Sequence, residues 1–293
     1  MTLSAADGAT LAAAENLSAR TPGLTLAPRS PRDGRLGPHR SGRAGAGYEF
    51  WQHRPYAAGD APASIDWRRS ARADNALLVR ERENETAASL AVWIDGSASM
   101  DWSAGGRPKK SERAAVLSLA LADAFSRGGE PVQIIDGPSG ARVGRGAAAA
   151  LLADLKTAPS AAPPQRAPSR AAALLLMSDF LFEIDALAPL LREAASRGIG
   201  GALCCVRDPA EETFSQGGRL IVEDAEGGAE ARLDAAESIA DAYATAVRAH
   251  RAELDDLCRK TGFQLIEART NDPAETAFRG LVAALAKPPR GGA

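Results

Sequence analysis

Residues 89–99 read Ser-Leu-Ala-Val-Trp-Ile-Asp-Gly-Ser-Ala-Ser, and the interpretation of the whole chain starts from them. Ser89–Ile94 is a short apolar run, as expected for a buried strand. The run is closed by Asp95, and two serines follow at alternate positions, Ser97 and Ser99. The stretch therefore predicts a loop at a strand end that carries one carboxylate and two hydroxyls.

Strand and helix patterns alternate from this run to the end of the chain. Short apolar runs mark the strands, and apolar residues three and four positions apart mark the helices. The predicted strands cover 89–94, 132–135, 172–177, 202–206 and 263–266. The predicted helices cover 109–127, 147–155, 187–198, 234–262 and 272–287. This alternation predicts an α/β fold with a doubly wound, mostly parallel sheet and helices on both faces.

The composition divides the chain into four parts. Residues 1–46 are rich in Ala, Gly, Pro, Ser and Arg, and show only a short helical pattern at 11–19, so we expect a poorly ordered arm. Residues 47–86 alternate aromatic and charged residues and end near a predicted strand at 77–82. We expect this extension to pack on the α/β domain, which covers 87–286. Residues 287–293 form a tail.

Several classes of protein are excluded by composition. The formal net charge of −2 gives no bulk attraction for nucleic acid or anionic lipid. We expect no signal peptide, since the first residues show no basic and apolar leader pattern, and no apolar stretch approaches the roughly 18–20 residues of a transmembrane helix. We therefore expect a cytoplasmic protein without a transmembrane segment. The 3 cysteines cannot form a disulfide framework, and adjacent Cys204 and Cys205 should face opposite sides of a strand as small buried residues.

Two predicted strands end in carboxylates, Asp95 and Asp179. Ligands of such sheets bind at the carboxyl ends of the strands, where the strand order reverses, so both acids should meet Ser97 and Ser99 there. Hard oxygen donors at this spacing suit an octahedral cation such as Mg²⁺, with waters as the remaining ligands. The alternative is that Asp95 and Ser97 only cap and brace the turn.

This pattern resembles the metal-ion-dependent adhesion site of von Willebrand factor A domains. In that family a carboxylate and two serines meet an acid from a later strand, which corresponds here to Asp95, Ser97, Ser99 and Asp179. The resemblance implies a von Willebrand factor A-like fold and a site for Mg²⁺ or Mn²⁺. The family's threonine ligand is missing from residues 142–147, where an arginine, at position 145, would place positive charge. The site is therefore degenerate, and the same loop could also bind a partner without metal.

The segment ahead of this site resembles a bacterial family more specifically. The residues that carry the resemblance are Glu49, Phe50, Arg54, Tyr56, Gly59, Asp60, Ile65, Asp66, Trp67, Ala71 and Arg72. On this signature, residues 47–285 are similar to domain-of-unknown-function family fifty-eight. The resemblance implies an adaptor or chaperone partner of a MoxR-type AAA+ ATPase, acting with other von Willebrand factor A-like proteins. Such partners could hold the protein at the periphery of the inner membrane.

Charged residues of the signature lie among aromatic ones, and partly buried charges must pair to offset their desolvation. Arg54, Asp60, Asp66 and Arg72 are the charges concerned. They could form a salt-bridged brace that holds residues 47–86 on the main domain. The functional alternative is a docking surface for the ATPase.

We expect a non-enzymatic protein-interaction module, and two other functions are less well supported. A hydrolase using Ser97 or Ser99 would need a G-x-S-x-G elbow, whereas the loop reads Gly-Ser-Ala-Ser-Met, and no late histidine lies near a strand end. Nucleic-acid binding through the arginine-rich N-terminal region is the second alternative. The arginines there are mixed with acids and form no basic stripe interleaved with aromatics.

Overall fold

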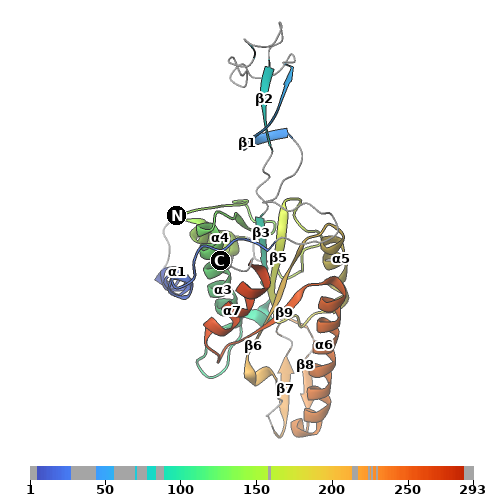
Figure 1. Cartoon of the computed structure of the whole chain (residues 1–293). Coiled ribbons are helices and arrows are strands. Elements are labelled where there is room, and N and C mark those ends of the chain that lie inside the picture. Colours follow the sequence, from blue (N-terminus) through green and yellow to red (C-terminus); the bar gives the residue numbers. More distant parts are fainter. Residues whose placement is uncertain are drawn as a thin grey trace, which may run out of the picture. The chain divides into compact units, whose positions relative to one another are not determined.

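The computed structural model describes residues 5–27, 44–55, 70, 78–83, 89–157, 160–212, 217–223, 225, 227–228 and 230–286. The chain forms two compact units, one from residues 1–29 and 89–293, the other from residues 30–88. Figure 1 labels most of the helices and strands of both units. Among the described residues, no helix combines the length and the apolar character needed to cross a membrane.

The larger unit is built on a five-stranded sheet in which every pair of neighbours is parallel. Its strands are β3 (Ser89–Ile94), β4 (Val132–Ile134), β5 (Ala171–Ser178), β6 (Gly200–Arg207) and β9 (Gln264–Arg269). The spatial order is β4-β3-β5-β6-β9, so the winding direction reverses beside β3. The predicted α/β fold with a doubly wound parallel sheet is confirmed, and all five predicted strands are present.

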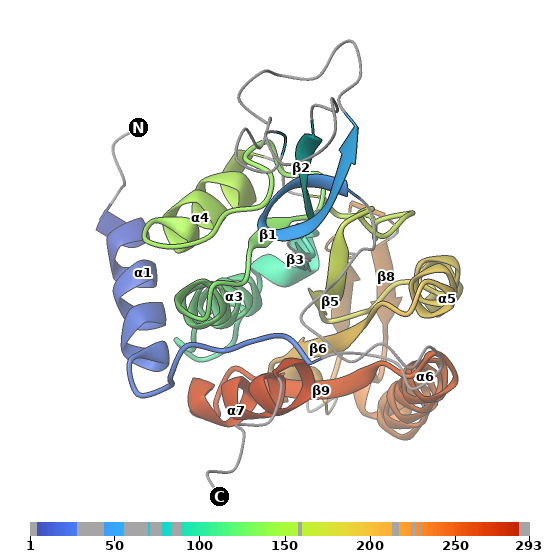
Figure 2. The ribbon, with the colours of Figure 1, turned by 45° about the horizontal axis from the view of Figure 1, so that its top comes forward.

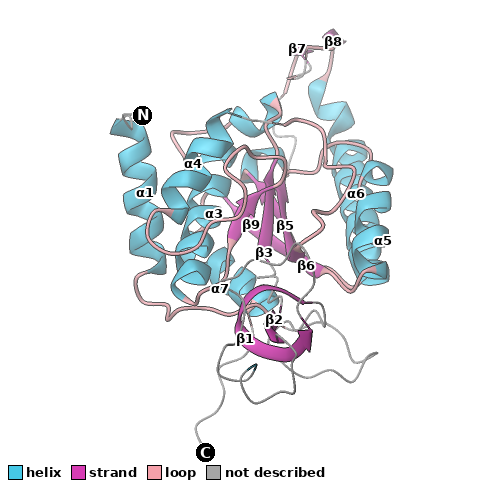
Figure 3. Cartoon of the chain, turned by 90° about the horizontal axis from the view of Figure 1, so that it is seen from above, coloured by secondary structure: helices cyan, strands magenta, loops and turns pink. Residues whose placement is uncertain are grey.

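Helices cover both faces of this sheet (Figures 2 and 3). One face carries α3 (Lys110–Arg127), α4 (Ala147–Thr157) and α7 (Ala274–Leu285). The other face carries α5 (Ala188–Ser196) and α6 (Ala240–Thr261). Each face therefore has its own hydrophobic cluster, as two layers of helices around one sheet require.

Side chains of the central strands alternate between the two clusters. Leu90 and Val92 of β3 enter one cluster, and Ala91 enters the other. This alternation explains why the strands read as continuous apolar runs, because both faces are buried. Cys204 and Cys205 follow the same rule in β6: both are buried free thiols, and they enter opposite clusters as predicted.

Residues 5–27 differ from the poorly ordered arm that the composition predicts for 1–46. They form α1 (Ala5–Ser18) and an extended segment, and α1 packs beside α3. Ala14, Leu24 and Leu26 are buried in the same cluster as α3 and α7. The sequence pattern is weak because alanine lies on every side of α1, so apolar and polar faces show little contrast.

The end of α6 follows the prediction, but its start does not. Gly262 adopts a left-handed φ of 73° and ends the helix, as its position predicts. The capping box expected from Asp234 and Glu237 is not formed. A short 3₁₀ turn at Ala236–Ile239 precedes α6, and the Glu237 carboxylate accepts the backbone N–H of Gly218 instead (2.9 Å).

A separate two-stranded ribbon precedes α6. Its strands are β7 (Leu220–Glu223) and β8 (Glu230–Leu233), which pair antiparallel. The sequence predicts an edge piece at 219–222, with a turn at Gly227 and Gly228. The strand is present, but it pairs with β8 and not with the main sheet.

In the smaller unit, β1 (Ala44–Pro55) pairs antiparallel with β2 (Leu78–Glu83), which matches the strand predicted at 77–82. Glu49 and Arg54 of the signature belong to β1. Tyr56, Gly59, Asp60, Ile65, Asp66, Trp67 and Arg72, and the tail at 287–293, lie outside the described residues. The choice between a brace and a docking surface therefore stays a prediction.

The packing of residues 5–27 can be tested with Leu26→Ala. Leu26 is 3% exposed, so truncation should lower the free energy of unfolding by about 2–5 kcal/mol, through lost burial and a residual cavity. Urea denaturation measures this change. Leu181→Ala is the control, because Leu181 is 63% exposed and should have little effect. Equal stabilities of the two variants would contradict the packing of this segment.

Candidate functional site

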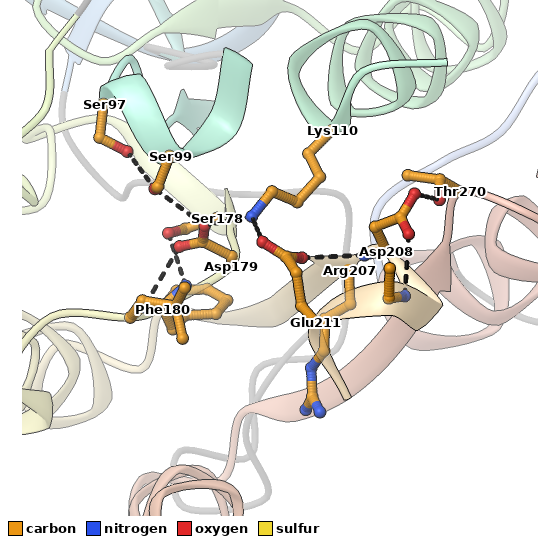
Figure 4. Close-up of polar contacts among 12 residues, drawn as sticks. Ser97, Ser99, Lys110, Ser178, Asp179, Phe180, Arg207, Asp208, Glu211 and Thr270 are labelled. Carbon is orange, nitrogen blue, oxygen red and sulfur yellow. Dashed lines mark hydrogen bonds and ion pairs between the residues drawn. The ribbon is translucent and has the colours of Figure 1, made fainter. Parts of the chain in front are cut away.

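The structure brings together all four residues predicted for the site. Asp95 follows β3 and Asp179 follows β5, and these neighbouring strands end side by side. The Ser97 and Ser99 hydroxyl oxygens are 3.0 Å apart. Ser99 donates a hydrogen bond to Asp179 Oδ2 (2.8 Å; Figure 4). The switch point of the sheet thus carries the oxygen cluster expected there.

Asp95 is held in place by hydrogen bonds from two serines. Its Oδ1 accepts the backbone N–H of Ser97 (2.8 Å), and its Oδ2 accepts the hydroxyl of Ser178 (2.5 Å). Burial raises the pKa of Asp95 above its ordinary value, these hydrogen bonds lower it, and the charge of Asp179 raises it further. The turn-bracing role considered as an alternative is therefore present.

Lys110 is the residue of this site that sequence reasoning missed. Its side chain is fully buried at the start of α3, and Nζ donates to Asp179 Oδ2 (2.7 Å) and to Glu211. Burial alone would lower the pKa of Lys110, but the two carboxylates outweigh it and raise the pKa, so the ammonium stays charged. A lysine in the first turn opposes the helix dipole. An unfavourably placed lysine at a predicted helix start is therefore the sequence signal that could have identified Lys110 as the partner of a buried carboxylate.

The sequence predicts a competing positive charge from Arg145, but the structure places the ammonium of Lys110 at the site instead. Arg145 is exposed in the loop before α4, and it is not among the residues that line the site. The positive charge that contacts Asp179 comes from Lys110. The reason is topological: the chain after β4 reaches the edge of the sheet, whereas α3 begins beside the ends of β5 and β6.

Asp208, directly after β6, anchors the neighbouring loop. This buried carboxylate accepts hydrogen bonds from Arg107 Nε (2.8 Å), Arg107 Nη2 (2.5 Å), the Thr270 hydroxyl (2.6 Å) and the Ala210 backbone (2.9 Å). Burial alone would raise the pKa of Asp208, but the bonds from Arg107, Thr270 and Ala210 hold it well below its usual range. Asp208 and Glu211 also form a capping box, whose D-x-x-E pattern can be read in the sequence.

Phe180 fixes the backbone beside Asp179. It is a non-glycine residue with a left-handed φ of 56°, which costs roughly 1–3 kcal/mol. The conformation is supported by the Ser178 hydroxyl, which accepts its N–H (2.8 Å), and by His250 Nε2, which lies 2.6 Å from its carbonyl oxygen. The buried ring of Phe180 adds packing. The position of the Asp179 carboxylate is thereby fixed by its own loop.

The oxygen cluster opens into a cleft of about 690 Å³, which Asp95, Ser97, Ser99 and Asp179 all line. Three exposed hydrophobic side chains line the same cleft: Trp102 (39% exposed), Leu181 (63%) and Val222 (40%). Exposed apolar side chains that gather at one place mark sites of protein contact. The cleft therefore combines polar groups at its base with an apolar rim.

The donor set of this cleft fits a hard divalent cation in part. Two carboxylates and two hydroxyls supply oxygen ligands of the kind Mg²⁺ prefers. Among the described residues, no three His, Cys, Asp or Glu side chains are placed to hold an ion by themselves, so a cation would depend on the serine hydroxyls. Asp179 and Glu211 share the ammonium of Lys110, and Asp95 adds a third carboxylate, which leaves negative charge for a cation to neutralise.

Lys110→Met tests the buried ion pair. The variant leaves Asp179 and Glu211 without their counter-ion, and removal of one partner from a buried pair costs about 3–5 kcal/mol of unfolding free energy. Chemical denaturation measures the loss. Lys109→Met is the matched control, because Lys109 pairs with Asp101 at the surface and should change stability little. A Lys110→Met protein as stable as this control would refute the role assigned to Lys110.

Asp208→Asn tests the anchor through its pH dependence. Because the folded-state pKa of Asp208 is lowered, its ionised form stabilises the fold above the unfolded pKa of about 3.9, and this stabilisation is lost as the pH falls toward the folded pKa. The difference in unfolding free energy between the wild type and Asp208→Asn should therefore be largest at pH 7 and smaller at pH 3. A difference that stays constant or grows on acidification would contradict this account.

Comparisons with known proteins place the chain in a family. The model of the family described as "Protein of unknown function DUF58" matches residues 52–253. Uncharacterized proteins of Mycobacterium bovis and Mycobacterium tuberculosis are 28% identical over 272 residues, which is 85% of this chain and 83% of each relative.

Two solved structures from Bacteroides are also similar to part of the chain. One is an aerotolerance-related membrane protein from Bacteroides fragilis (TM-score 0.39, 13% identity), and the other is the conserved hypothetical protein BatB from Bacteroides thetaiotaomicron (TM-score 0.37, 14% identity). Each match covers 67% of this chain and 97% of the other. The family model, in contrast, matches more than half of the sequence. The chain belongs to the DUF58 family of proteins of unknown function.

Proposed function

We propose that this protein is a non-enzymatic interaction module whose partner docks in the cleft at the ends of β3 and β5. The observation that carries the proposal is the meeting of Ser97, Ser99 and Asp179 at the base of a cleft rimmed by exposed hydrophobic side chains. Apolar contact at the rim would supply affinity, and the polar base would select the partner.

A divalent cation at the base would make this selection specific for an acidic partner. Asp95, Ser97, Ser99 and Asp179 would hold Mg²⁺ or Mn²⁺, directly or through water. When bound, the cation offers an open coordination position to a carboxylate of the partner. Lys110 already neutralises part of the charge on Asp179, so the site is a weaker cation site than one without a buried lysine. The metal-free alternative uses the same hydroxyls as hydrogen-bond donors.

The partner that the family resemblance suggests is a MoxR-type AAA+ ATPase, with this protein as its adaptor or chaperone partner. The loop pattern and the parallel sheet support a von Willebrand factor A-like architecture, which is suited to protein contacts at the strand ends. Other von Willebrand factor A-like proteins would join the same assembly. We place it in the cytoplasm, held at the periphery of the inner membrane through these partners.

Calorimetric titration with Mg²⁺ and with Mn²⁺ tests the cation. We expect heat of binding for the wild type and its loss in Asp95→Ala, because the substitution removes one of the two carboxylates at the base of the cleft. Asp185→Ala is the control, since Asp185 is an exposed carboxylate outside the cleft. Absence of heat in the wild type, or the same heat in Asp95→Ala, would rule out the cation and leave the metal-free version of the proposal.

Co-purification of the ATPase with and without Mg²⁺ tests the partnership itself. Capture of the ATPase by the wild type, and its loss in Ser99→Ala, would support docking at the cleft. Equal capture by both proteins would show that the ATPase contacts a surface outside the cleft.

A further inference from the structure

The lining of the cleft at the ends of β3 and β5 is acidic. Among the described residues that line it, the side chains with a formal charge are all carboxylates: Asp95, Asp101, Asp179 and Glu211. Lys109 pairs with the second of these, and Lys110 pairs with the last two. Four carboxylates against two ammoniums leave two negative charges in excess. The cleft therefore attracts a positively charged ligand.

Asp95 is the carboxylate of this lining that has no counter-charge. It is only 2% exposed, and it accepts hydrogen bonds from Ser97 and Ser178, which are both neutral. Within the described part of the chain, no cationic side chain pairs with it, because Lys110 is taken up by two other carboxylates. A buried carboxylate is costly unless it is paired. A positive charge supplied by a ligand would offset this cost.

The walls of the cleft suit an organic cation. Trp102, which is 39% exposed, lines the cleft together with Phe182 and Tyr243. A guanidinium stacks on aromatic faces and also donates paired hydrogen bonds to carboxylates. A metal ion depends on a set of ligands, and no three His, Cys, Asp or Glu side chains of the described residues are placed to hold one. An arginine side chain needs no such set.

The arginines closest to hand belong to a neighbouring pocket. This pocket, of about 350 Å³, lies between α6 and the end of β6 and shares Leu181 and Tyr243 with the cleft. Arg207 and Arg251 line it, and both contact Glu267. Figure 4 shows the guanidinium of Arg207 pointing away from the ammonium of Lys110. The two guanidiniums therefore add no counter-charge at the base of the cleft.

We propose that the metal-free cleft binds an arginine side chain of a partner protein. The guanidinium would donate hydrogen bonds to the carboxylates of Asp95 and Asp179, and its stem would lie against Trp102. Apolar residues on either side of the arginine would contact Leu181 and Val222 at the rim. The inference rests on the proposed function, since it names the chemistry of the partner that docks in the same cleft.

Fluorescence polarisation in EDTA tests the inference with a labelled peptide, Gly-Ser-Leu-Arg-Leu-Ser-Gly with blocked ends. The full-length protein should bind it at least about tenfold more tightly than the same peptide with citrulline in place of arginine, because citrulline keeps the shape and lacks the charge. Asp95→Asn should remove this preference. Asp185→Asn is the matched control, since it changes an exposed carboxylate outside the cleft and should keep the preference. Equal binding of the two peptides, or a preference retained by Asp95→Asn, would overturn the inference.

If Asp95→Asn fails to fold, an exposed residue of the lining takes its place. Ala98 is exposed and lines the cleft, so its substitution should leave the fold intact. Ala98→Lys supplies a resident ammonium and should abolish the preference for arginine over citrulline. Ala98→Gln has a similar length without the charge and should keep it. The same preference in both variants contradicts the site.

Further outcomes separate this inference from the proposed function and from another ligand. Capture of the ATPase that depends on Ser99, combined with equal binding of the arginine and citrulline peptides, would overturn the inference and leave docking at the cleft intact. An arginine preference that Asp95→Asn removes supports the inference even where capture of the ATPase does not depend on Ser99. Displacement of the labelled peptide by ethylguanidinium, at the concentration at which the unlabelled peptide displaces it, would identify a small organic cation as the ligand and overturn the assignment to a partner protein.

Discussion

The buried ammonium of Lys110 is the interaction on which the candidate site depends. It lies at the start of α3 and contacts Asp179 after β5 and Glu211 after β6, so one charge joins three elements that are far apart in the sequence. Without it, two carboxylates would face each other in a poorly solvated position, which is strongly unfavourable. The cost of burying the lysine is therefore offset by its two ion pairs, which also fix the relative position of the strand ends.

The same polar network limits movement of the loops. Ser178 holds both the Asp95 carboxylate and the Phe180 backbone, and Ser99 links the first loop to Asp179. Asp208 ties the loop after β6 to Arg107 and Thr270. Loops fixed in this way present a preformed surface, and a preformed surface loses less conformational entropy when a partner binds.

The fold was predictable because its strands are buried on both faces and read as apolar runs. The meeting of Asp95 with Asp179 was predictable because parallel strands end at the same edge. The contacts of Lys110 and Arg207 could not be predicted, since the pairing of charges that are distant in the sequence leaves no periodic signal. The packing of α1 was missed for another reason: alanine occurs on every side of the helix, so its buried face has no pattern.

The cleft and the pocket differ in charge, and the difference has consequences for any partner. At the serine end, Asp179 and Glu211 share the ammonium of Lys110, and Asp95 adds a further carboxylate to the lining. The neighbouring pocket at the end of β6 is lined by two guanidiniums, those of Arg207 and Arg251, together with the carboxylates of Asp179, Glu211 and Glu212. Between the two ends, Leu181 and Tyr243 form a shared apolar boundary.

Complementary charges fix orientation more than they add affinity. An acidic segment of a partner would be repelled at the serine end, where carboxylates outnumber the ammonium of Lys110, unless a cation lay between them. Occupation of the serine end by a cation would therefore decide whether the cleft accepts an acidic segment or a basic one.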